Sequence, residues 1–447
     1  MALGIIELND AGIQVATDNG LLGTSPGFAV LDGNKLLVGE EALRNARLLP
    51  RWTNNKFWNQ LNTDPIPNST HEIRHHADLA FAHLESLWLL LKDKIDSVIL
   101  LVPAFYDHQQ LGLLLGMVKE CGIPVTGVVD SSVIAASEQD IRQTCLHLDI
   151  HLHRVTLTTL SMGSTLKRKE VITIAETGIF TLWDRWANII ADQFIQTSRF
   201  DPMYEAGSEQ ALFNQLPKWI SNLGDERSNT FELDLGEISH AVAISNDQLM
   251  TACMQLYPQI VQTVRAQIPE GEPASLILSH HFTGFPGLKD SLGLIKSIEI
   301  IEARPQQSIT NALTRADNII PKDGAISHVI SLPSSQKGTH RPHKPVNAAS
   351  VSGLATHLLI ESHAVAIGRS FGLAKVEASA EDGTTSIAND PEHALCTLFP
   401  RGDSLQMDVH LADSFLVNGE VPASKDSLKA GDIITIGDLT ITLIAVS

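Results

Sequence analysis

Histidine and carboxylate side chains gather at a few points of the sequence, and these residue types can bind metals or transfer protons. The chain has 18 histidines. Asp149, His151 and His153 alternate along one segment, and residues 280–281 are both histidine. Together with a carboxylate from Asp149 or Asp10, such imidazoles are the donor set of a transition-metal site. The same residues can equally fill a cleft or lie in solvent, and we expect no metal.

The sequence lacks the motifs of common nucleophilic and phosphate-binding sites. No G-x-S-x-G turn is present to expose a nucleophilic serine. Neither G-x-G-x-x-G nor G-x-x-x-x-G-K-[ST], the glycine-rich loops that cradle phosphates, occurs anywhere. These absences favour a non-catalytic protein, but they do not by themselves decide the question.

Length and composition limit the class of protein. The 447 residues are 43% hydrophobic and 19% charged, a composition typical of a globular chain of about two to four domains. The formal net charge of −19 argues against binding to nucleic acids and to anionic membrane surfaces. Apolar runs are far shorter than the roughly 20 residues that span a bilayer, and the N-terminus has no basic flank. We therefore expect no membrane insertion and a cytoplasmic location.

The hydrophobic pattern divides the chain into two parts. Over residues 1–332, strands joined by tight turns alternate with segments of helical spacing, which predicts an α/β fold with mixed sheets. The clearest elements are a buried strand at 98–102 and a helix at 107–121. Residues 333–355 are rich in Pro, Ser, Gly and Lys, which predicts a flexible linker. Short alternating segments over 356–447 predict a small all-β sandwich.

Three segments of the first part, in order, resemble the nucleotide-binding domain shared by actin, sugar kinases and the heat-shock chaperone ATPases. The similarity is greatest to the chaperone branch. Residues 24–46 resemble its edge strand, turn and V-G-x-x-A helix start, and V-P-A-F-Y at 102–106 resembles its V-P-A-Y-F strand end. Pro-Gly-Leu at 286–288 fits its adenosine loop. The resemblance implies an actin-like (ribonuclease H-like), two-lobed ATPase fold for most of residues 1–332.

The loops that would hold ATP and magnesium depart from that family's pattern. Glu7 stands at the position of its first-turn Asp, and Asp10 would bring a negative charge towards a polyphosphate. The second turn keeps Asp149 but replaces three glycines with residues 151–153, and residues 280–281 replace the paired glycines of the adenosine loop. Bulk at these turns prevents the close backbone approach that phosphates need. The residues that would line this degenerate nucleotide cleft are Glu7, Asp10, Asp149, His151, His153, His280 and His281.

Residues 356–447 resemble a forkhead-associated domain. The markers are Gly-Arg at 368–369, V-N-G at 417–419 and L-x-x-G-D-x-I-x-I-G at 428–437. In that family an Arg, a Ser and an Asn of the loops bind phosphothreonine. Here Asp390 falls at the Ser position and Asp413 near the Asn position, and ionised carboxylates repel a phosphate. The candidate peptide-binding residues are Arg369, Asp390, His393, Asp413 and Asn418.

These observations predict a non-catalytic pseudo-ATPase, acting as a scaffold or assembly adaptor with a protein partner and without a cofactor. Two alternatives stay open. The chain can be a divergent chaperone-like protein that still binds ATP and magnesium, or an adaptor that reads phosphothreonine through its C-terminal domain.

Overall fold

The chain is a mixed α/β protein that divides into two compact units, Met1–Gly338 and Thr339–Ser447. The computed structural model describes residues 2–447 except 143, 224–227, 237, 270, 323, 335–354, 361–362, 369, 378–384, 391–392, 402–403, 412–413, 423–424, 437–438 and 445–447. Most of the predicted linker, residues 335–354, therefore lies outside the described residues. Pro333 ends a strand of the first unit, and Ala355 is buried in the core of the second.

A six-stranded mixed sheet begins the first unit. Strand β1 pairs antiparallel with β2 and parallel with β7. Its sequence is predominantly apolar, which is typical of a strand whose two faces are both covered. Across the sheet the strands are β3 (Gly20–Ser25), β2 (Ile13–Thr17), β1 (Leu3–Glu7), β7 (Ser97–Val102), β8 (Val125–Asp130) and β16 (His328–Val329).

A second six-stranded sheet repeats this arrangement. Its first three strands form antiparallel hairpins, and β9 then pairs in parallel with β14, as β1 does with β7. Across the sheet the strands are β17 (Ser331–Pro333), β11 (Thr165–Ala175), β10 (Arg154–Met162), β9 (Thr144–Ile150), β14 (Ala274–Leu278) and β15 (Ile298–Glu302). Five strands of each sheet thus follow the same order, third–second–first–fourth–fifth. We call the first sheet with the elements packed on its outer face the first half of the unit, and the second sheet with its elements the second half.

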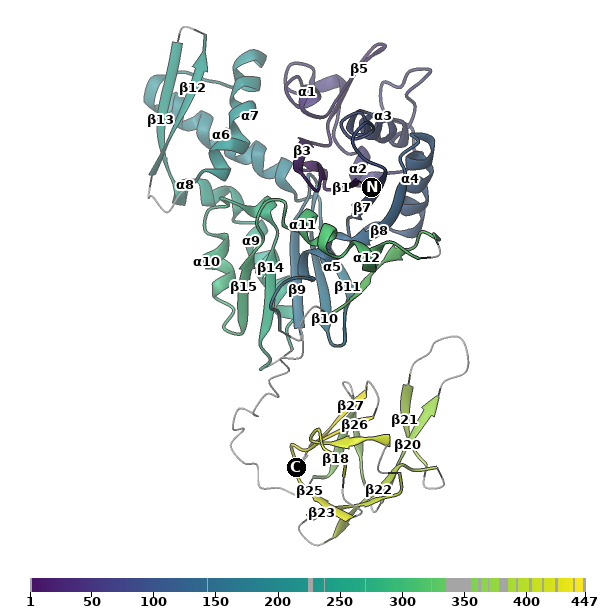
Figure 1. The fold of residues 1–447 in the computed structure, drawn as a ribbon. Coiled ribbons are helices and arrows are strands. Elements are labelled where there is room, and N and C mark those ends of the chain that lie inside the picture. The colour runs from purple at the N-terminus through teal and green to yellow at the C-terminus, as the bar shows by residue number, and fades with distance from the viewer. Residues whose placement is uncertain are drawn as a thin grey trace. The chain divides into compact units, whose positions relative to one another are not determined.

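Alternation along the strands places side chains in different cores. In β1, Ile5 belongs to a core shared by both sheets, whereas Ile6 faces a core on the other side. The shared core includes Val133 and Ile134 of α5 (Ser131–Ala136) and Ile309 of α11 (Gln307–Thr314). Sheets and helices therefore form alternating layers (Figure 1).

The outer cores are covered by helices. On the first sheet these are α2 (Phe57–Gln60), α3 (His76–Trp88) and α4 (His108–Glu120), where the sequence predicts a helix over 107–121. Asp107 caps α4 by accepting the amide of Gln110. On the second sheet the helices are α6 (Ile179–Ser198), α7 (Ala206–Ser221), α9 (Leu256–Ala266) and α10 (Leu288–Gly293).

Each half carries an insertion after its third strand. The first contains a small sheet with α1 (Gly39–Leu43), and the second contains a hairpin that packs on α6 and α7 (Figure 1). The remaining elements are β4 (Ala29–Asp32), β5 (Lys35–Val38), η1 (Pro50–Trp52), β6 (Thr53–Asn54), β12 (Ser228–Leu235), β13 (Ile238–Ser245), α8 (Asn246–Met250), η2 (Thr251–Cys253), η3 (His280–Phe282) and α12 (Ala316–Ile319).

The end of the first unit joins its two sheets. Strand β16 pairs in parallel with β8 of the first sheet, and β17 pairs antiparallel with β11 of the second. Only Ile330 separates these two strands along the chain. The segment of six residues from 328 to 333 therefore pairs first with one half and then with the other.

The described strands of the second unit form two five-stranded antiparallel sheets that share one core. Leu358, Ile434 and Leu443 line it from one sheet, and Leu373 and Leu405 from the other. The first sheet orders β19 (His363–Ala366), β18 (His357–Ile360), β27 (Leu439–Ile444), β26 (Ile433–Ile436) and β24 (Leu416–Val417). The second orders β21 (Thr385–Asn389), β20 (Phe371–Glu377), β22 (Cys396–Arg401), β23 (Ser404–Val409) and β25 (Lys425–Leu428).

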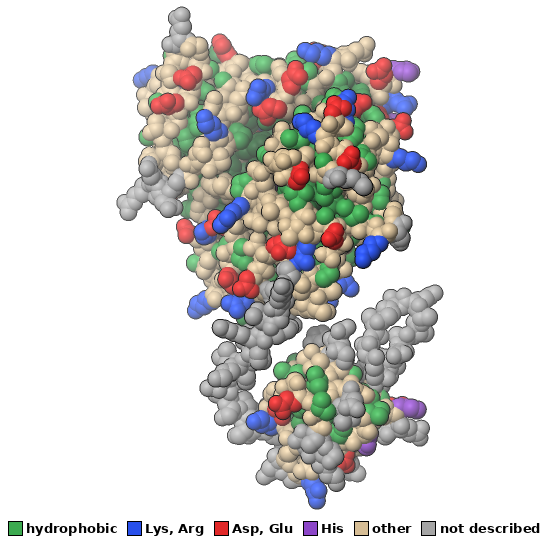
Figure 2. Space-filling model, in the orientation of Figure 1, with side chains coloured by type: hydrophobic (Ala, Val, Ile, Leu, Met, Phe, Trp, Pro, Cys, Tyr) green, Lys and Arg blue, Asp and Glu red, His purple; other side chains and the backbone are tan. Residues whose placement is uncertain are grey.

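The surface and the helices bear on the classes of partner. On the face shown in Figure 2, acidic and basic side chains of the first unit are interspersed rather than gathered by sign. None of the described helices is long and apolar enough to cross a membrane.

We predict that residues 339–447 fold when produced without the first unit. Their core is built from residues 355–443 alone, and it buries side chains from both sheets. Circular dichroism should show a cooperative strand-to-coil transition, and amide NMR signals should be dispersed. A random-coil spectrum would contradict this expectation.

Candidate functional site

Three loops from different parts of the chain meet between the two halves of the first unit. They are the turn after β1, the turn between β9 and β10, and the loop of η3 that follows β14. The first belongs to one half and the other two to the second half. We call the residues that meet here the polar cluster: Asn9, Asp10, Asp149, His151, Ser279 and His281.

Asn9 connects the two hairpin turns. Its side-chain amide donates to Asp149 Oδ2 at 3.0 Å and to the carbonyl oxygen of Ile150 at 3.1 Å. Its own side-chain oxygen accepts the amide of Ala11 at 2.9 Å and fixes the turn. Asn9 is only 3% exposed, so its amide occupies space between the halves and binds groups of both.

Asp10 forms a second bond between the turns. Its Oδ1 accepts the backbone amide of Leu152 at 2.8 Å. Helix α6 also binds the turn between β9 and β10, because the amides of Ile179 and Phe180 at its start donate to the carbonyls of His151 and Leu152. The backbone N–H that would otherwise face a ligand in this turn is therefore already bonded to protein.

Asp149 and His281 form a buried ion pair. His281 Nδ1 lies 3.2 Å from Asp149 Oδ1, and the Ser279 hydroxyl donates to the same oxygen. Burial lowers the pKa of His281, but the hydrogen bond and charge of Asp149 outweigh it and raise the pKa above 6.5. Burial likewise raises the pKa of Asp149, but attraction to His151 and His281 brings it well below 3.8.

Burial shifts the pKa values of the other titratable groups in and beside the cluster towards the neutral form. It raises the pKa of Glu7 to about 7 and that of Asp10 to about 6. It lowers the pKa of His151 to about 4 and that of His280 to about 3. At pH 7 the two histidines are therefore neutral, Glu7 is partly protonated and Asp10 is mostly ionised.

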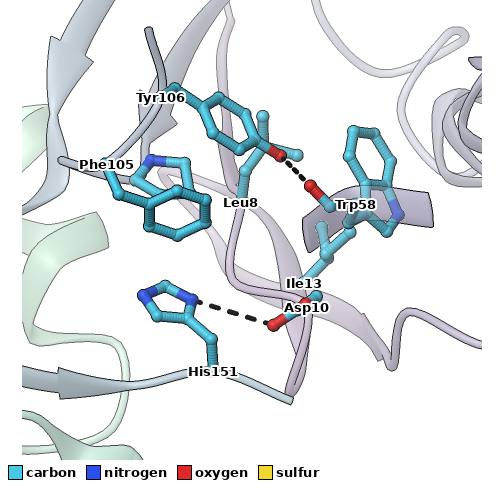
Figure 3. A pocket seen from close by; sticks show the side chains of 8 residues that line it. Leu8, Asp10, Ile13, Trp58, Phe105, Tyr106 and His151 are labelled. Atoms are coloured by element: carbon cyan, nitrogen blue, oxygen red, sulfur yellow. Dashed lines mark hydrogen bonds and ion pairs between the residues drawn. The ribbon is translucent and has the colours of Figure 1, made fainter. Parts of the chain in front are cut away.

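Side chains leave little space beside the cluster. His151 lies 3.7 Å from both Asp10 Oδ1 and Asp149 Oδ2, between the two carboxyl groups. The cavity that Asp10 and His151 line together with Phe105, Tyr106 and Trp58 has a volume of about 10 Å³ (Figure 3). That is enough for about one water molecule, whereas ligand sites are typically about 300–1,000 Å³.

The remaining predicted residues of the cleft divide into three cases. Glu7 is 6% exposed, and its carboxylate is close enough to His281 and Asp149 for their charges to shift its pKa. His280 approaches the side-chain amide of Gln14, at 3.2 Å, which adds a contact between the halves. His153 turns away from the cluster and contacts Asn55 at 3.0 Å.

Two arginines form ion pairs that join the halves outside the cluster. Arg168 of β11 donates to Asp130 Oδ2 at 2.6 Å and to the carbonyl of Ala104. Asp130 is fully buried, so the arginine supplies the charge partner that a buried carboxylate requires. On the side of α1, Arg47 pairs with Asp184 and with Glu209 of the second half.

Two serine–histidine contacts lack the geometry of an activated nucleophile. The indole N–H of Trp58 donates to His83 Nδ1 at 2.9 Å. In the neutral ring the proton is therefore on Nε2, which donates to the Ser25 hydroxyl at 2.7 Å. His83 is then a donor and not a base. Ser279 donates to a carboxylate, and the neighbouring His281 carries the charge of an ion pair.

Metal binding was the other chemistry open to these residues. Among the residues that the structure describes, no group of three or more His, Cys, Asp or Glu side chains is placed so that it could hold a metal ion.

The candidate residues of the second unit fall into two groups. Arg369 and Asp413 lie outside the described residues. Asp390 pairs with the exposed His393 at 3.0 Å. Asn418 is engaged within the protein, since its amide donates to Asp432 Oδ1 at 3.1 Å and its oxygen accepts the amide of Ile433 at 2.9 Å. Asn418 therefore stabilises the β24–β26 connection.

Several residues that join the halves are missed by sequence reasoning. The sequence marks Asn9 as a bulky residue in place of a glycine of the resembled turn, but it does not predict the bonds of Asn9 to the opposite half. Arg47, Arg168 and Ser279 carry no signal, since their partners Asp184, Asp130 and Asp149 are 137, 38 and 130 positions away in the sequence.

No family model matches the chain, and no curated protein is significantly similar to it in sequence.

We predict that Glu7→Gln stabilises the first unit as pH rises. With a pKa near 7 when folded and 4.5 when unfolded, Glu7 binds its proton more tightly in the folded state. Its ionisation penalty is absent below pH 4.5 and complete above pH 7. The gain in unfolding free energy should grow from about 1 kcal/mol at pH 5 to about 3 kcal/mol at pH 8.

Urea titration followed by tryptophan fluorescence is the measurement, because all six tryptophans lie in the first unit. Glu41→Gln makes the same change at an exposed position and should show no such trend. A gain for Glu7→Gln that does not depend on pH would contradict the buried, protonated carboxyl group.

A second prediction separates a structural from a ligand-binding role for Asn418. Glycine accepts the positive φ of 51° at this position, so Asn418→Gly removes mainly the two hydrogen bonds. The second unit should lose about 1–2 kcal/mol of stability, and hydrogen exchange at the Ile433 amide should accelerate. His393→Ala, at an exposed pair, should change stability by less than about 0.5 kcal/mol. Unchanged stability in Asn418→Gly would return Asn418 to the candidate ligand-binding residues.

Proposed function

We propose that this chain is a non-catalytic scaffold or assembly adaptor, with an actin-like or heat-shock-type fold that has given up nucleotide binding. The repeated strand order of the two sheets supports the fold assignment, because a two-lobed fold of this kind consists of two similar halves. The resembled segments at 24–46, 102–106 and 286–288 add to that support.

The observation that carries the proposal is the bonding of Asn9 across the two hairpin turns. In the resembled family these turns present free backbone amides to phosphates. Here the side chains of Asn9 and Asp10 take up Asp149, the Ile150 carbonyl and the Leu152 amide. A triphosphate would have to break these buried bonds, and each buried group left unpaired costs about 1–3 kcal/mol. It would also meet the carboxyl group of Asp10.

The same bonds favour a rigid body over an opening and closing enzyme. Contacts between the halves occur at the polar cluster, at Arg168–Asp130 and at Arg47, and a pair of strands ties both sheets. A fixed body with a stable surface suits a protein that binds other proteins. We propose that its partner is a protein of the cytoplasm.

We propose that the second unit is a forkhead-associated-like sandwich that contributes a protein-binding surface without reading phosphate. Two five-stranded sheets around one core support the first part of this assignment. The internal engagement of Asn418 supports the second, because its amide is then not free for a phosphopeptide.

We predict that the full chain neither binds ATP with magnesium in calorimetric titration nor hydrolyses it. Because the Leu152 amide donates a hydrogen bond to Asp10, hydrogen exchange at this amide should be slow and unaffected by ATP. Micromolar binding that disappears in Asp149→Ala would overturn the proposal in favour of a divergent, ATP-binding chaperone-like protein.

A further inference from the structure

An open hollow on the first unit is lined mainly by uncharged polar side chains. It lies between residues 59–63, at the end of α2, and residues 105–113, which lead into α4, with Arg154 of β10 at its wall. Asn59, Gln60 and Gln109 are among the lining amides. The volume of about 670 Å³ falls within the range of small-molecule sites, roughly 300–1,000 Å³.

Arg154 is held in place without a carboxylate. Its Nε donates to Asn59 Oδ1 at 2.5 Å and its Nη2 to the Asn59 carbonyl at 3.3 Å. The guanidinium carbon lies 4.1 Å from the centre of the Phe105 ring. Phe105 in turn meets His151 edge-on, with ring centres 5.0 Å apart. The guanidinium plane is therefore fixed on two sides before any ligand arrives.

The charge of Arg154 has no ion-pair partner among the described residues. Asp10 is near enough to act on it electrostatically, but the Asp10 carboxyl group already accepts the Leu152 amide. Burial lowers the pKa of Arg154 and the charge of Asp10 raises it, and the effect of burial is the larger, so Asp10 offsets only part of the loss of water. Charges in such positions are normally paired.

The other side chains of the hollow limit what can bind there. Asp107 also lines it, and its carboxylate caps α4 through the Gln110 amide. One cation, one anion and several amides suit a ligand with a carboxylate and additional hydrogen-bond donors. A guanidinium presents a planar pair of donors that matches a carboxylate.

We propose that this hollow binds a small carboxylate that also carries hydrogen-bond donors, such as a free polar amino acid, and that Arg154 holds its carboxylate. The site is separate from the bonds of Asn9 that carry the proposed function, so either proposal can fail without the other.

The test is calorimetric titration of the full chain with glutamine, serine, succinate, glutaminamide and inorganic phosphate as probes. At least one amino acid should bind, and glutaminamide, in which an amide replaces the carboxylate, should bind at least tenfold more weakly than glutamine. Arg154→Gln should weaken binding at least tenfold, and Arg154→Lys by an intermediate factor. Arg51→Gln removes another arginine that lies over an aromatic ring and should leave binding unchanged.

Gln109→Glu provides a second variant if Arg154→Gln does not fold. It places a negative charge at an exposed position of the same wall and should abolish binding of the carboxylate probes. The proposal is overturned if none of the amino acids binds, if binding is indifferent to both variants, or if phosphate binds as tightly as the carboxylates.

Discussion

The way the two halves of the first unit meet depends on the hydrogen bonds of the Asn9 side chain. One amide group, buried between two hairpin turns, satisfies a carboxylate and a carbonyl of the opposite half. Polar groups at that depth are costly when they lack partners. Asp149, Ser279 and His281 provide hydrogen bonds to one another, whereas Asp10 Oδ2 and His281 Nε2 have no hydrogen-bond partner among the residues that the structure describes.

The pKa values in and beside the polar cluster depend on how closely these side chains lie together. Three carboxyl groups, Glu7, Asp10 and Asp149, lie near one another, and Asp149 forms an ion pair with His281. Burial raises the pKa of Glu7 to about 7 and that of Asp10 to about 6, although the charge of His281 lowers both and that of Arg154 lowers the pKa of Asp10. The halves are thus joined by a buried hydrogen-bonded layer, whose strength is less sensitive to salt than that of surface ion pairs.

The sequence predicted elements more readily than contacts. Continuous apolar runs such as 98–102 and the capped segment that begins at Asp107 appear where expected, because local patterns suffice to specify them. The gathering of residues near positions 10, 150 and 280 followed from the resemblance alone. The orientation of His153 did not, because the turn after His151 breaks the alternation of the strand and directs the ring to Asn55. The pairing of Arg168 with Asp130 depends on which strands become neighbours, and no local pattern encodes that.

The tie between the two sheets has a consequence for biosynthesis. Strand β16 pairs His328 with Val128 of β8, so the two partners leave the ribosome 200 residues apart. At about 5–20 residues per second, that separation corresponds to about 10–40 s of translation. Throughout this interval the outer edge of β8 has no neighbouring strand to cover it. An uncovered strand edge can pair with a second chain, so nascent chains stalled before residue 328 should be the form of this protein most prone to aggregation.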